Sequence, residues 1–396
     1  MPTCACMEIP HARRFAPTAL MLGNIVTGCS VLAPAGMLSE LSAGLDVSIR
    51  TAGLLITFGA IMLCIGSPVT AWLTSWIERR TLLTVTLAVL ALTNAASAFA
   101  PDYTSLLVIR VIMLAIGALY TPQAAGTGAL IVPLQKRGST IAYIFLGWSL
   151  AAAIGLPLIT FVASRYGWRA AYGGIGVLGC VSFLLLLWRL PGGLIGAPVD
   201  LKTWTDVGRN RMILLLLAIT TLQMSGQFVV FTFMGPLLAK LTGAGPDAIS
   251  LVFACYGVCG FIGIAIATRI VDSWGAWKTS VLFTVLLLSG VTGWAFSAGI
   301  YALMAASVAI WGLGFASTNS MQQVRLVGAA PSLASASVSL NTSVLYVGQA
   351  VGSAIGGFLY ARDLLHAAGY VAAVFVALAL TLMILTKPRR VAAQPV

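Results

Sequence analysis

Long apolar stretches separated by short polar segments run through the whole chain. A helix that crosses a membrane needs about 20 mostly apolar residues, and on that rule the pattern predicts twelve spans. They cover roughly residues 15–37, 51–74, 81–99, 104–132, 140–163, 170–189, 212–238, 249–268, 279–298, 301–324, 335–360 and 368–386. We therefore expect an all-α integral membrane protein.

One connecting segment differs from the other, tighter connections. It holds glycine, proline and charged residues, and it separates six expected spans from six. This pattern predicts an N-terminal six-helix half over residues 1–189, a linker over 190–211, and a C-terminal six-helix half over 212–396.

A short polar motif occurs twice, at an interval close to half the chain. In each copy a glycine near the end of a span precedes a polar or charged loop. The first copy holds Gly66, Ser75, Glu78, Arg79 and Arg80, and the second holds Gly263, Arg269 and Asp272. The two glycines are 197 residues apart, which indicates two pseudo-symmetric halves.

Composition supports a lipid environment. The 396 residues are 59% hydrophobic and 8% charged, with a mean hydropathy of +1.00, whereas soluble domains are about a quarter charged. The net charge of +12 comes from Lys and Arg between the spans and mostly on one side, so it is the positive-inside signal. We expect both termini in the cytoplasm, contact with the lipid bilayer and no nucleic-acid partner.

Several other classes of function are disfavoured. The seven cysteines form no disulfide or metal-ligand framework, because most fall inside apolar spans. No span carries a nucleophile, histidine and acid together, and no Walker-type phosphate loop is present. We therefore expect neither an enzyme nor an ATP-driven pump, and no cofactor or metal.

Glycine and proline recur inside the spans. Helix breaks survive in a membrane where neighbouring helices or a cavity satisfy the freed carbonyls, and small residues let helices approach closely. The main examples are Gly147, Gly155 and Pro157 in the fifth span and Gly348, Gly352 and Gly356 in the eleventh. Two interpretations stay open: plain helix packing, or surfaces along which the halves rock.

These features together resemble the major facilitator superfamily, and within it the twelve-helix drug:proton antiporter family, in the sugar and arabinose-type efflux branch. The resemblance is carried by the segment from Gly66 to Arg80, by Arg110 in the fourth span, and by the fifth-span glycines. The chain departs from the family pattern at Ser75, where the family has an acid, and at Leu156, which separates Gly155 from Pro157.

The resemblance implies a secondary transporter of the bacterial inner membrane, working by alternating access around a site between the halves. It also implies proton-linked efflux of a small solute. An importer or uniporter of the same fold is the alternative, and a membrane sensor is a third. Two pseudo-symmetric halves in one chain can hold a complete pathway, so we expect a monomer.

The acids are placed unusually for a proton-coupled transporter. All ten fall in tails or loops, so a coupled proton would be carried at the periphery, by Glu40 or Asp46, or by the substrate. Arg110 is the one charge inside a span, and burying it unpaired would cost about 3 kcal/mol. We expect it to bind backbone carbonyls at broken helices or a polar group of the substrate, with snorkelling to the interface as the alternative.

The remaining polar groups inside the spans are neutral. The resemblance assigns the first, fourth, seventh and tenth spans to the central cavity. The candidate cavity residues are Asn24, Arg110, Gln223, Gln227, Asn319 and Asn341. Each amide alone is also typical of interhelical packing. Together they predict a neutral-to-basic cavity suited to a sugar, a nucleoside, a neutral drug or an anion.

Overall fold

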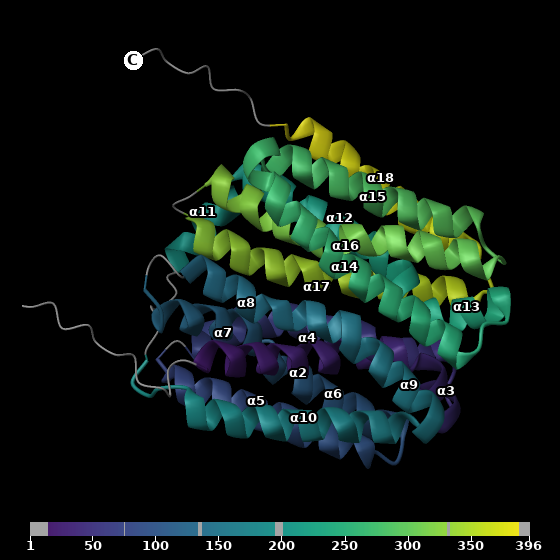
Figure 1. Cartoon of the computed structure of the whole chain (residues 1–396), viewed down its shortest axis with the longest axis horizontal. Coiled ribbons are helices and arrows are strands. Elements are labelled where there is room, and N and C mark those ends of the chain that lie inside the picture. Colours follow the sequence, from purple (N-terminus) through teal and green to yellow (C-terminus); the bar gives the residue numbers. More distant parts are fainter. Residues whose placement is uncertain (1–14, 75, 134–136, 195–200, 331–332, 388–396) are drawn as a thin grey trace, which may run out of the picture.

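The computed structural model describes residues 15–74, 76–133, 137–194, 201–330 and 333–387. Within these residues, twelve helices are long and apolar enough to cross a membrane. This confirms the expected all-α membrane architecture of twelve spans in two halves. Figure 1 shows the halves stacked, the N-terminal helices in purple to teal below and the C-terminal helices in green to yellow above.

Two spans of the N-terminal half, the fourth and the fifth, are each divided into more than one element. Its elements are α2 (Ala16–Gly36), α3 (Leu38–Gly44), α4 (Ile49–Leu73), α5 (Arg79–Ala98), α6 (Tyr103–Gly117), α7 (Tyr120–Leu130), α8 (Arg137–Leu150), the π-helical turn η2 (Ala151–Gly155), α9 (Leu156–Tyr166) and α10 (Trp168–Arg189). The fourth span is α6 followed by α7. In the fifth span, Pro157 cannot donate to the carbonyl four residues before it, and the helix widens into η2 there.

A short helix, α11 (Leu201–Arg209), lies in the linker region before the C-terminal half. The elements of that half are α12 (Arg211–Phe231), α13 (Met234–Thr242), α14 (Pro246–Trp274), α15 (Ala276–Phe296), α16 (Tyr301–Ala329), α17 (Ala334–Ala361) and α18 (Ala367–Leu385). The seventh span is α12 continued by α13, and α16 is longer than the expected tenth span.

The halves meet mainly where α4 packs on α17 and where α14 packs on η2 and α9. The Thr57 hydroxyl donates to the Ser353 hydroxyl at 3.0 Å between α4 and α17. A Cβ on Gly257 of α14 would lie 2.2 Å from the Cα of Ala153 in η2, so this contact requires glycine. Hydrophobic residues of both halves, from Cys29 to Val376, share one buried cluster beside these contacts.

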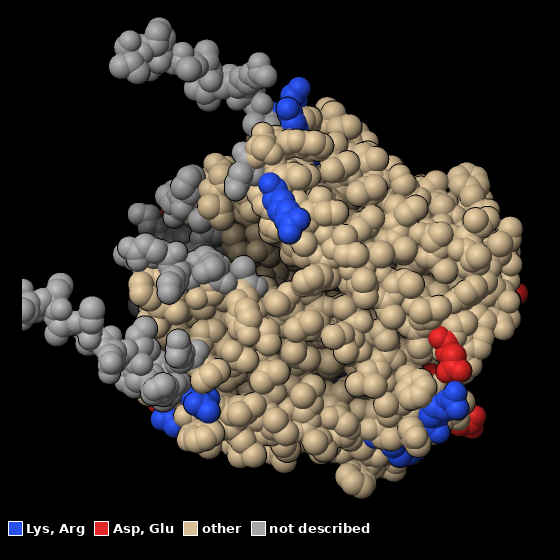
Figure 2. All heavy atoms as spheres, viewed as in Figure 1, with Lys and Arg blue, Asp and Glu red and all other residues tan. Residues whose placement is uncertain are grey.

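The two ends of the molecule differ. We call the end where α2 begins and α18 ends the terminal end, and the opposite end the far end. At the far end α13 contacts α2 and α3, so the halves are closed together. Figure 2 shows a hollow between the halves on the left, toward the terminal end.

Candidate functional site

The guanidinium of Arg110 in α6 is enclosed between α2 and α4. Arg110 is 1% exposed. Its Nε donates to the Leu55 carbonyl at 2.7 Å, Nη1 to the Ser30 carbonyl at 2.9 Å, and Nη2 to the Val31 carbonyl at 2.9 Å. Arg110 therefore clamps two neighbouring helices through charge-assisted hydrogen bonds to their backbones, and the side chain does not snorkel.

Pro34 explains why α2 offers a carbonyl at this point. In an unbroken helix the Ser30 carbonyl would accept the N–H four residues later, but Pro34 has no N–H. That carbonyl is left for Arg110. The Ser30 hydroxyl accepts from the Asn94 side chain at 2.9 Å, so α5 joins the same network. In this conformation the network is closed to solvent.

A second cluster of polar side chains in the N-terminal half is centred on Asn24 of α2. Its Nδ2 donates to the Ile144 carbonyl at 2.9 Å, and its Oδ1 accepts from the Thr121 hydroxyl at 2.9 Å. The indole N–H of Trp148 donates to that hydroxyl at 3.0 Å. Asn24 itself is fully buried, whereas Thr121 and Trp148 are half-buried.

In the C-terminal half the buried amides of α12 meet side chains. Gln227 accepts a hydrogen bond from the indole N–H of Trp311 at 3.0 Å, and Gln223 donates to the Thr284 hydroxyl at 2.8 Å. Trp311 also packs edge-to-face on Tyr256, with ring centroids 5.3 Å apart. The result is a compact amide and aromatic cluster that contains no charge.

Two further candidates lie together between α16 and α17. Asn341 donates to the Asn319 side chain at 3.1 Å and accepts from the Thr220 hydroxyl at 2.7 Å. Of the expected cavity residues, Asn319 is half-buried and the others are buried. In this conformation each of these side chains therefore forms a hydrogen bond with another residue of the protein.

Another buried arginine, Arg325, falls outside the predicted tenth span, which ends near residue 324. Helix α16 continues to Ala329, however, and Arg325 is 8% exposed. It donates to the Gln322 side chain at 2.9 Å and to the Thr386 hydroxyl at 2.8 Å. The signal was the spacing of Gln322 and Arg325, which share one face of a helix.

The first loop motif is anchored within the N-terminal half. The Glu78 carboxylate accepts from the Gly193 backbone N–H and from the Thr81 hydroxyl. The Gly193 hydrogen bond, and then that of Thr81, hold the pKa of this carboxyl below its usual value. The segment after α10 therefore docks on this loop.

The neighbouring arginines strengthen the same junction. The Arg79 side chain is buried and donates to Gln123 of α7, and Arg80 donates to the Leu187 carbonyl at 2.7 Å. Gly66 packs closely on α6, where an added Cβ would lie 3.0 Å from the Ala115 carbonyl oxygen.

The rest of the duplicated motif is described only in part. Arg269 of the second copy is exposed on α14. Ser75 and the side chain of Asp272 lie outside the described residues. A hydrogen-bond partner like that of Glu78 is not seen for Arg269 among the described residues.

The glycines of the fifth and eleventh spans pack inside their own halves. Added Cβ atoms on Gly147 and Gly155 would lie 2.4 Å from the Met21 carbonyl oxygen and 2.5 Å from the Cys29 sulfur, both in α2. On Gly348, Gly352 and Gly356 of α17 they would lie within 2.5 Å of α12 carbonyl oxygens. The fifth span thus packs on the first as the eleventh packs on the seventh. In this conformation these contacts are plain helix packing, as in the first of the two open interpretations.

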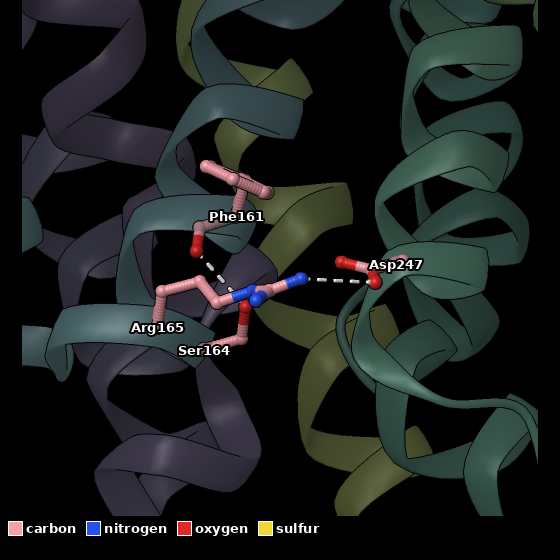
Figure 3. Close-up of polar contacts among 4 residues, drawn as sticks. All are labelled: Phe161, Ser164, Arg165 and Asp247. Atoms are coloured by element: carbon pink, nitrogen blue, oxygen red, sulfur yellow. Dashed lines mark hydrogen bonds and ion pairs between the residues drawn. The ribbon is translucent and has the colours of Figure 1, made fainter.

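At the far end one ion pair joins the two halves (Figure 3). Arg165, in the last turn of α9, lies 3.3 Å from Asp247, in the first turn of α14. Both side chains are exposed, so the pair contributes at most about 1 kcal/mol. The Arg165 guanidinium also lies 5.6 Å from the centroid of the Phe161 ring.

The acids whose placement is described lie at helix ends, in loops or in the short helices α3 and α11. Glu40 lies in the first turn of α3 and lines a cavity of about 150 Å³ between the halves. Asp102 caps α6 by accepting the Ser105 N–H at 2.8 Å. Among the described residues, the middle of each spanning helix is free of acid.

The fold and the polar centres define a class: a polytopic helical membrane protein of two related six-helix halves, with neutral amides and buried arginines between its helices. The Major Facilitator Superfamily family model matches residues 20–338 and 216–396. The chain belongs to this superfamily, whose members are transporters and not enzymes.

Named relatives span nearly the whole chain. The inner membrane transport protein YdhP of Escherichia coli (strain K12) is 29% identical over 351 residues, 87% of this chain and 89% of the relative. A probable sugar efflux transporter of Mannheimia succiniciproducens is 25% identical, covering 89% and 88%. A bacterial homologue of the lysosomal transporter Spinster, solved inward-facing and occupied, superposes with a TM-score of 0.75 at 14% identity, covering 96% and 97%.

Proposed function

We propose that this chain exports a small neutral or anionic solute across the bacterial inner membrane by alternating access, with proton-linked efflux as the mode of coupling. The observation that carries the solute class is the chemistry of the polar centres. They consist of amides, hydroxyls, an indole and a guanidinium, and the described spans hold no acid in their middle. A lipophilic cation would require a carboxylate at such a site.

The closed far end and the hollow toward the terminal end support the alternating-access part of the proposal. Reorientation would close the terminal end and open the far end around the same polar centres. Excess Lys and Arg in the loops of the terminal end support a cytoplasmic location for that end and for both termini. A sugar is a natural first candidate, since a relative is named a probable sugar efflux transporter.

The test is solute counterflow in proteoliposomes that contain only this protein. A panel of sugars, nucleosides, neutral drugs, organic anions and lipophilic cations is loaded in turn, with and without an imposed pH step. We expect exchange of a neutral or anionic solute, accelerated by a pH step. Flux restricted to cations would overturn the solute class, and flux that ignores the pH step would favour the uniporter alternative.

Direction is tested separately in cells. Deletion should raise the accumulation of the identified solute, and an uncoupler should raise it in the wild type but add little in the deletion strain. Accumulation that falls on deletion would identify an importer instead. A sensor would produce no flux with any solute of the panel.

A further inference from the structure

The far-end closure places one half-buried acid, Glu40, between the two halves. Glu40 lines the cavity of about 150 Å³ that α2, α3 and α9 of one half form with α13 and α14 of the other. The cavity wall near Glu40 is mostly apolar and small, with Gly235, Pro236 and Ile249 contributed by the C-terminal half. Thr160 of α9 also lines the cavity. This wall exists only while the halves are together.

The charged residues around Glu40 either bind other groups or are exposed to solvent. Those on its own loop and on the elements packed near it are Asp46 after α3, Arg50 of α4, Arg165 of α9, Arg169 of α10, Lys240 of α13 and Asp247 of α14. Arg165 pairs with Asp247 at 3.3 Å and Lys240 with Asp363 at 3.2 Å. Arg169 donates to the Ala100 carbonyl at 3.0 Å, while Arg50 and Asp46 are exposed. Among the described residues, no cation forms an ion pair with Glu40.

An unpaired carboxylate loses hydration when an apolar surface closes over it, and the neutral acid loses much less. Burial raises the pKa of Glu40, against a smaller opposing effect of a backbone hydrogen bond. When the far end opens, water replaces the wall from the C-terminal half, and the pKa moves back toward its ordinary value of 4.5. The closed state therefore binds a proton more tightly than the open state.

We propose that Glu40 is a proton-binding site of the far-end gate: the halves close over the protonated carboxylic acid, and opening releases the proton to solvent on that side. The sign follows from linkage. Low pH at the far end favours closure, and as the pH rises through the raised pKa the closed state loses that advantage. The Arg165–Asp247 pair at the rim also joins the two halves.

The inference rests on the alternating access proposed above, and the test separates the two. Spin labels are placed at Ala43→Cys in α3 and Thr242→Cys at the end of α13, in a background whose seven native cysteines are replaced by alanine. Pulsed electron–electron distance distributions are then recorded in lipid nanodiscs from pH 4.5 to 8. The samples are the labelled parent, Glu40→Gln and Asp247→Asn.

In the parent we expect a short distance at low pH and a growing long-distance population as the pH rises. Because the closed state binds the proton more tightly, we expect the open-to-closed ratio to rise severalfold across this pH range. Glu40→Gln is neutral at every pH and should remove most of this slope while keeping the closed state. Asp247→Asn, the matched control, should raise the open population at every pH by a similar factor and keep the slope.

A slope in Glu40→Gln equal to that of the parent would overturn the proton site while leaving alternating access in place. A single short distance in every sample and at every pH would instead contradict alternating access, and the gate would fail with it. Loss of the slope in Asp247→Asn alone would identify Asp247 at the rim, and not Glu40, as the pH-sensitive group.

Discussion

The two halves share one architecture but bind their buried polar groups in different ways. In the N-terminal half, Arg110 and Asn24 donate to backbone carbonyls of other helices. In the C-terminal half, Gln227 and Asn341 pair with the side chains of Trp311 and Asn319. Backbone atoms move only with their helix, whereas side chains change rotamer locally. We propose that the N-terminal contacts act as a rigid clamp and that the C-terminal side chains form an adaptable binding surface.

The largest effect should come from Arg110→Ala. It removes three donors at once and leaves the buried Ser30 carbonyl, which has no helical donor because of Pro34, unsatisfied at a cost of about 1–3 kcal/mol. We expect flux at background level and a lower thermal midpoint of unfolding, measured by counterflow and by a thiol-independent thermal-shift assay. Arg110→Lys should recover little, because an ammonium cannot fork to three carbonyls as a guanidinium does.

Arg325→Ala is the matched control for that loss. It removes a buried arginine of the C-terminal half whose partners are the side chains of Gln322 and Thr386. We expect it to retain measurable flux. Normal transport by Arg110→Ala would reduce Arg110 to a packing residue, and equal losses in both variants would remove the distinction between the halves.

A smaller effect should follow from Pro34→Ala. The new N–H competes for the Ser30 carbonyl that now accepts from Arg110, so one of the three hydrogen bonds of the clamp weakens. We expect flux to fall about fivefold, corresponding to about 1 kcal/mol. In the Arg110→Ala background the same change should have no further effect on the thermal midpoint, since interacting residues are not additive. Additive losses would contradict the link between Pro34 and Arg110.

The buried side-chain contacts of the C-terminal half are tested by Trp311→Phe. It removes the indole N–H and leaves the Gln227 carbonyl oxygen without its donor, while keeping an aromatic ring in place. We expect the KM for the counterflow solute to rise about threefold to tenfold with a small change in maximal flux. Trp294→Phe, which alters another fully buried tryptophan of this half, should leave KM unchanged. A drop in maximal flux alone would mean that Trp311 supports the conformational change rather than the solute.

The sequence was sufficient for the fold because hydropathy is strong over long spans and the motif interval reveals the duplication. It also pointed to Arg110, since a charge inside an apolar span requires a partner. Which carbonyls Arg110 would bind could not be predicted, because that depends on how α2, α4 and α6 face one another. Hydropathy does not encode this.

Other features could not be predicted from the sequence for related reasons. The charge of Arg325 ends the apolar run of the tenth span, although helix α16 continues past it. The contact of Gly257 with η2 and the Arg165–Asp247 pair join segments far apart in the chain. A periodic pattern within one helix gives no information on a neighbour from the other half.

The smallest effect concerns the first loop motif, and it sharpens the comparison at the terminal end. Glu78 accepts the Gly193 N–H and the Thr81 hydroxyl, and its pKa is lowered below the ordinary 4.5. A lowered pKa means that the charged form is favoured in the folded state. This stabilisation is therefore complete above the unfolded pKa and is lost as the pH falls through the folded pKa.

Glu78→Gln should lower the thermal midpoint slightly at pH 7 and flatten its decline between about pH 5 and 3. Arg269→Gln, in the exposed second copy, should match the wild type throughout. An unchanged acid limb in Glu78→Gln would show that the docked loop adds nothing to the rigidity of the N-terminal half.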